Sequence, residues 1–153
     1  MPHVSAELME RTWRRIGACD GHEIEKLQKQ HLRAQNPLTM FVYEKMSVFR
    51  EDAAGLLLYV YHVVFEAFRT ADPNAKLVSK PQIQLASRKL TAAIPFVVDQ
   101  ALESSPEQHV LRYAYEAFTE EGDNVALSEE EIDSFLHIGQ IVIACLHGAS
   151  RRE

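Results

Sequence analysis

The stretch AAGLLLYVYHVVFEAF, from Ala53 to Phe68, decides the fold of this chain. It is the most apolar segment, yet it carries a histidine and a glutamate. Its uncharged part lies between Asp52 and Glu66 and has 13 residues, positions 53 to 65. A membrane-spanning helix needs ~20 such residues, whereas a run of this length is typical of a buried core helix. We therefore predict a core helix of a water-soluble protein and no membrane span.

The two polar residues of this stretch, His62 and Glu66, share one narrow side of the predicted helix with Arg69, and the remaining surface is almost wholly apolar. We expect both at a partly solvated edge, where Glu66 pairs with His62 and Arg69. The spacing resembles the His-x-x-x-Glu of hemerythrin-like proteins over these five positions, which implies a ligand- or metal-binding bundle as the alternative. The second motif of that family, His-x-x-x-His, is absent. The prediction is that the chain binds no metal or other cofactor.

Signals that begin and end helices recur along the whole chain, and no run alternates polar and apolar residues as a strand does. With 153 residues the chain has the size of one domain. The sequence therefore predicts a single all-α domain, residues 1–153, built as a compact bundle of about six helices.

Several helix ends can be assigned to particular residues. Ser5 is the expected N-cap of the first helix, and capping boxes are predicted at Ser105-Pro-Glu-Gln108 and Ser128-Glu-Glu-Glu131. Asn36 and Pro37 end the second helix and begin a third.

Two helical segments are harder to divide. The pattern leaves open whether 38–71 is one helix bent at Gly55 or two helices. A further helix is expected from Pro81 to Glu103, with a kink at Pro95.

The last helix, from Glu129 to about His147, is the second that is apolar over more than half of its surface. A bundle of six helices has one central position, so a second apolar helix favours a partner surface, and symmetric dimers are the commonest oligomers. We predict homodimer assembly through this helix; the alternative is one layered bundle that contains both helices. The predicted interface residues are Phe135, Ile138, Ile141, Val142 and Cys145.

Charge and cysteine content narrow the possible partners and the cellular location. The net charge of -6 disfavours nucleic acid. Cys19 and Cys145 stand in no metal-binding or redox spacing, as expected of reduced thiols in the cytoplasm, and the acidic N-terminus does not match a secretory signal. We predict a cytoplasmic protein without nucleic-acid or membrane partners.

No compact catalytic motif is present, so an enzymatic activity stays open. Trp13, in RTWRR, is expected to pack inward, and His109, Arg112 and Glu116 are expected to form a solvated charge cluster. The predicted function is that of a non-catalytic protein that acts through protein-protein interaction or homodimer assembly. A ligand- or metal-binding bundle that uses His62 and Glu66 is the alternative.

Overall fold

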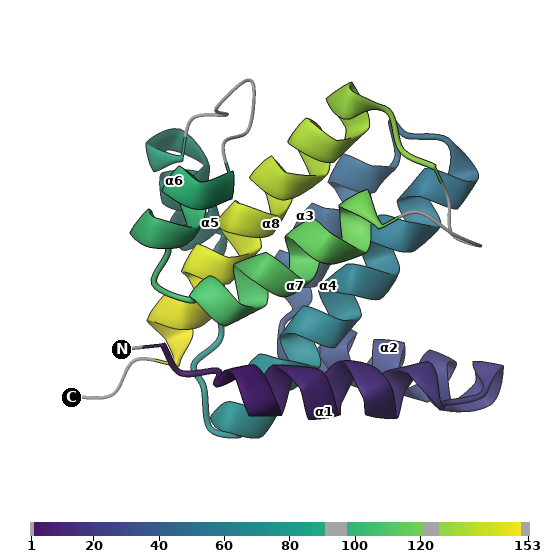
Figure 1. Ribbon diagram of the computed structural model, residues 1–153. Coiled ribbons are helices and arrows are strands. Elements are labelled where there is room, and N and C mark those ends of the chain that lie inside the picture. Colours follow the sequence, from purple (N-terminus) through teal and green to yellow (C-terminus); the bar gives the residue numbers. More distant parts are fainter. Residues whose placement is uncertain (1, 91–97, 121–125, 151–153) are drawn as a thin grey trace.

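The computed structural model describes residues 2–90, 98–120 and 126–150, and in these ranges it contains eight α-helices and no β-strand (Figure 1). The predicted all-α class is therefore confirmed. The helices are α1 (Ala6–Gly17), α2 (Gly21–Ala34), α3 (Asn36–Met46), α4 (Glu51–Ala71), α5 (Lys80–Lys89), α6 (Val98–Ser104), α7 (Gln108–Thr119) and α8 (Glu129–Ala149).

Helix α4, which contains the apolar stretch, is central and packs against α1, α2, α3, α7 and α8. Helix α8 packs against α3, α4, α5 and α7, so both apolar helices lie in the same bundle. The five residues predicted to form a dimer interface are between 0 and 8% exposed within the single chain. The chain's own helices thus cover this face of α8, and the homodimer stays a prediction that requires another surface. These residues are Phe135, Ile138, Ile141, Val142 and Cys145.

Helix α8 also has the length and mean hydropathy of a membrane span, with 21 residues and a mean of 1.3 over its most apolar window. The core helix of a soluble protein meets the same two criteria. Of that window, 44% is buried inside the structure, where side chains of α8 pack against the neighbouring helices.

Two of the predicted helix starts are confirmed by their hydrogen bonds. The Ser5 hydroxyl accepts the backbone N–H of Leu8. The Ser128 hydroxyl accepts that of Glu131, whose carboxylate accepts the backbone N–H of Ser128 in return. The capping box predicted at Ser105 is wrong: α7 begins only at Gln108, and the Glu107 side chain binds the N-terminal segment instead.

The number of helices exceeds six because two predicted segments are divided. Segment 38–71 forms α3 and α4, with the break at 47–50 and Gly55 inside α4. The helix predicted from Pro81 to Glu103 is described as α5 and α6, and the predicted kink at Pro95 lies outside the described residues.

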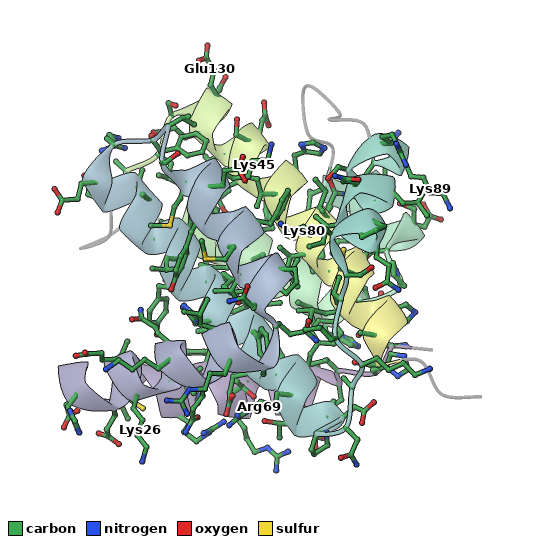
Figure 2. The ribbon with its side chains drawn as sticks, turned by 180° about the vertical axis from the view of Figure 1, so that it is seen from behind. Lys26, Lys45, Arg69, Lys80, Lys89 and Glu130 are labelled. Carbon is green, nitrogen blue, oxygen red and sulfur yellow. The ribbon has the colours of Figure 1, made fainter. Side chains whose placement is uncertain are left out.

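Charged side chains lie on the outside of this bundle. Figure 2 shows Lys26, Lys89 and Glu130 projecting from the surface. Few charged groups are buried among the described residues, and Glu66 and Glu107 are two of them.

Candidate functional site: a buried histidine pair and an aromatic groove

His62 and Glu66 are not at a solvated edge, so that prediction is wrong. Their side chains lie in the interior, with residue exposures of 3% and 4%. Helices α1 and α2 both pack on α4 and supply Arg15 and His31 to this side of it. Arg15 and His31 therefore lie where a partly solvated helix edge was predicted.

The two imidazoles of this site face one another across the α2–α4 contact. His31 Nδ1 lies 2.7 Å from His62 Nδ1, and the rings stack with centroids 5.0 Å apart. The His31 ring also stacks on Phe65, with centroids 4.3 Å apart. His31 is 0% exposed.

Glu66 collects donors from three helices. Its Oε1 atom lies 3.0 Å from His31 Nε2 and 3.0 Å from Arg69 Nε, and its Oε2 atom accepts a hydrogen bond of 3.1 Å from Arg15. Figure 2 shows Arg69 near the end of α4. Burial alone would raise the pKa of Glu66, but the hydrogen bonds from His31 and Arg15 and the charge of Arg69 hold the pKa at about 2. The carboxylate is therefore ionised at neutral pH.

The positions of the protons follow from these contacts. Burial lowers the pKa of His31, and burial next to His31 lowers the pKa of His62 to about 3, so both rings are neutral at pH 7. His31 donates from Nε2 to the ionised Glu66, which leaves its Nδ1 as an acceptor for the N–H of His62 Nδ1. The Nε2 atom of His62 is then a buried lone pair without a hydrogen-bond partner among the described residues.

This arrangement does not offer three metal ligands at one point. The facing imidazole nitrogens are bonded to each other, and both carboxylate oxygens of Glu66 are bound by arginine or histidine N–H groups. The contacts instead cross-link α1, α2 and α4. Nothing in the sequence pairs His31 with His62, because they lie 31 positions apart on helices of different polarity.

A groove of about 850 Å³ runs between α1, α4 and α7 on another part of the surface. In Figure 1, α1 crosses below α4 and α7. Trp13 was predicted to pack inward, but it is 39% exposed and lines this groove beneath the Arg14 guanidinium, 5.0 Å from its ring. The apolar and aromatic residues of the lining are Ala6, Met9, Trp13, Leu56, Tyr59, Val60, Tyr113 and Ala117.

The polar part of the groove comes from α7. His109, Arg112 and Glu116, which the sequence placed in a solvated charge cluster, line one wall together. No carboxylate of the described ranges lies within 4.0 Å of the Arg112 guanidinium, so this cation is available to a bound group. Burial raises the pKa of Tyr113, which keeps its phenol neutral beside the arginine.

Comparisons with protein-family models, with curated proteins and with solved structures find no match to this chain.

Proposed function

We propose that this chain is a non-catalytic binding protein whose groove between α1, α4 and α7 takes a small organic anion with a flat apolar body. The groove itself carries the proposal. Its volume of about 850 Å³ lies in the ~300–1,000 Å³ range of small-molecule sites. Three aromatic residues around it, Trp13, Tyr59 and Tyr113, suit a planar ligand.

The charge expected of the ligand follows from Arg112. A guanidinium recognises carboxylate, sulfonate or phosphate oxygens through paired N–H donors, and such charge-assisted bonds are about twice as strong as neutral ones. Glu116 and Glu120 also line the groove, so a ligand with several negative charges is disfavoured. A single anionic group on an aromatic body fits both observations.

The only tryptophan of the chain, Trp13, lies in the groove, so its fluorescence reports occupancy directly. The probe is 8-anilinonaphthalene-1-sulfonate, which joins one sulfonate to a flat apolar naphthalene body and accepts energy from tryptophan. We expect saturable binding of one probe per chain with energy transfer from Trp13. Arg112→Gln should weaken binding roughly tenfold, as expected for the loss of one charge-assisted contact.

Two controls separate the groove from general apolar binding. Ala117→Phe should block the groove and abolish energy transfer. Val48→Ser, at an 81% exposed apolar residue that does not line the groove, should leave binding unchanged. If Ala117→Phe binds the probe as the unaltered protein does, the proposal is wrong.

Homodimer assembly and interaction with another protein stay predictions of the sequence, and so does the cytoplasmic location. Both cysteines are free thiols, which is compatible with a reducing compartment. The unpartnered Nε2 atom of His62 favours the His62 and Glu66 alternative, whereas the groove offers the volume and the aromatic lining of a ligand site.

A further inference from the structure

A second polar cluster joins three segments that are distant in the sequence. His3 precedes α1, Glu107 is the residue before α7, and His147 is in the last turn of α8. One potential ligand atom from each of the three lies within 4.8 Å of the other two. Figure 1 shows the start of the chain beside the last turn of α8 and the start of α7.

The carboxylate of Glu107 is the most unusual member because it is 0% exposed. It accepts backbone N–H bonds from His3 at 2.9 and 3.1 Å and from Val4 at 3.1 Å, and its Oε2 lies 2.6 Å from His147 Nδ1. No lysine or arginine of the described ranges pairs with it. Burying an ionised carboxylate without a full counter-charge is costly, and a bound cation would supply that charge.

The donor set is selective. Two imidazoles and one carboxylate are the ligands of catalytic zinc and of non-haem iron, whereas calcium and magnesium prefer oxygen ligands alone. The backbone bonds from His3 and Val4 fix the orientation of the carboxylate, which is the role of the groups that surround the ligands of a metal site. His3 and His147 are only partly buried, so an ion could reach the cluster from solvent.

We infer that His3, Glu107 and His147 form a binding site for one divalent transition-metal ion, with zinc as the expected occupant. Three protein ligands leave a fourth position to water or to an exogenous group. The ion would replace the hydrogen between His147 Nδ1 and Glu107 Oε2, and these two atoms, now 2.6 Å apart, would separate to the roughly 3.3 Å that tetrahedral zinc requires of neighbouring N and O ligands. This site has no residue in common with the groove, so either proposal can fail without the other.

The competing explanation is a clamp without metal. In that case Glu107 and His147 form an ion pair whose only role is to hold the N-terminal segment against α7 and α8. Both explanations predict that Glu107→Gln lowers stability. Only the metal site predicts that zinc itself binds and stabilises the chain through the two histidines.

The test uses untagged protein freed of metal by a chelator and titrated with Zn²⁺ in a calorimeter. We expect one ion per chain, and a rise in the thermal unfolding midpoint when zinc is present. His3→Ala and His147→Ala should each weaken binding at least ~10-fold. Co²⁺ in place of zinc should give the visible absorption of a four-coordinate ion, which His147→Ala should remove.

The matched control is His22→Ala, which removes an exposed histidine outside the cluster. It should leave the zinc affinity and the Co²⁺ spectrum unchanged. The inference is overturned if the unaltered protein takes up no zinc under these conditions. It is also overturned if His22→Ala weakens binding as much as His147→Ala does, because the zinc would then lie at scattered surface sites. Circular dichroism of each variant establishes that it is folded before its affinity is compared.

Discussion

His31 and His62 lie with their Nδ1 atoms 2.7 Å apart in a part of the interior where both side chains are almost fully buried. One hydrogen occupies this contact. An additional proton on the pair would bury a positive charge, and this loss of solvation is why burial lowers the pKa of both imidazoles.

Acidification should therefore destabilise the protein well above the range in which carboxylates titrate. In the unfolded chain a histidine has a pKa of about 6.5, whereas folded His62 takes up a proton only near pH 3. Between these values the unfolded state binds more protons, so the free energy of unfolding falls as the pH falls. The slope approaches ~1.4 kcal/mol per pH unit for each such histidine. Urea unfolding curves recorded between pH 7 and pH 4 measure this slope.

Two variants test whether His62 causes this pH dependence of the unfolding free energy. His62→Leu should give a shallower slope between pH 6.5 and pH 4, because the unfolded state then takes up one proton fewer. His22→Gln, at an exposed position, should keep the slope of the unaltered protein. Equal slopes in the unaltered protein and in His62→Leu would contradict the assignment.

Glu66 should be among the residues most sensitive to substitution. Glu66→Leu leaves the buried N–H of His31 Nε2 without an acceptor and deprives Arg15 and Arg69 of their shared partner. The expected loss is ~3 kcal/mol of unfolding free energy. Glu10→Leu removes an exposed pair with Arg14 and should cost no more than ~0.5 kcal/mol. Urea denaturation at pH 7 measures both, and similar losses would count against the buried network.

Gln35 should be indispensable to the connection between α4 and α5. Its side-chain amide donates to the carbonyl of Lys76 at 2.9 Å, and its side-chain oxygen accepts the N–H of Val78 at 2.8 Å. Gln35→Ala would leave the buried N–H of Val78 and the part-buried carbonyl of Lys76 without their side-chain partner, at an expected cost of ~2 kcal/mol. Thermal unfolding tests this, with Gln28→Ala in α2 as the control. An equal effect of the two substitutions would exclude a special role for Gln35.

The two cysteines should differ in reactivity. Burial raises the pKa of the Cys145 thiol to about 11, whereas Cys19 is half-buried beyond the end of α1. Because the thiolate is the reactive form, a disulfide reagent near neutral pH should modify one thiol per chain rapidly. Cys19→Ser should remove that fast phase, and denaturant should expose the slow thiol. Two equally fast thiols in the folded protein would contradict the burial of Cys145.

Ile141 provides a test of the dimer predicted through α8. It is 2% exposed inside the single chain, so Ile141→Glu should bury an unpaired carboxylate and unfold the protein, a loss above ~4 kcal/mol. Gln140→Glu, at the half-buried neighbouring position, should stay folded. Circular dichroism and light scattering behind a sizing column follow both variants. If Ile141→Glu is a folded monomer and the unaltered chain is a dimer, the dimer interface lies on α8 as predicted.

The parts of the fold that were predictable are those that short-range chemistry decides. Ser5 and Ser128 cap their helices through groups three residues away, and the apolar run in α4 is buried as its composition requires. The residues of α8 that were predicted to form a dimer interface are covered by the chain's own helices, because what covers an apolar face depends on how the helices are arranged.

The sites were less predictable because their partners come from distant segments. In place of the Ser105 box, the Ser105 hydroxyl accepts the N–H of Glu107, and the Glu107 carboxylate binds the backbone of His3 and Val4, more than a hundred positions away. His62 and Glu66 are buried rather than solvated because α2 and α1 pack beside them and place His31 and Arg15 there. A helix pattern gives the side on which a residue lies, and it cannot identify what packs there.

Helix α1, one wall of the groove, is anchored near both of its ends. Arg15 binds Glu66 at one end, and the backbone of His3 and Val4 binds Glu107 just before the other. A hinge motion that moved α1 away from α4 and α7 would break the hydrogen bonds that α1 and its preceding residues donate to the buried carboxylates of Glu66 and Glu107. The groove is therefore preorganised, and a ligand that enters it loses little free energy to ordering the protein.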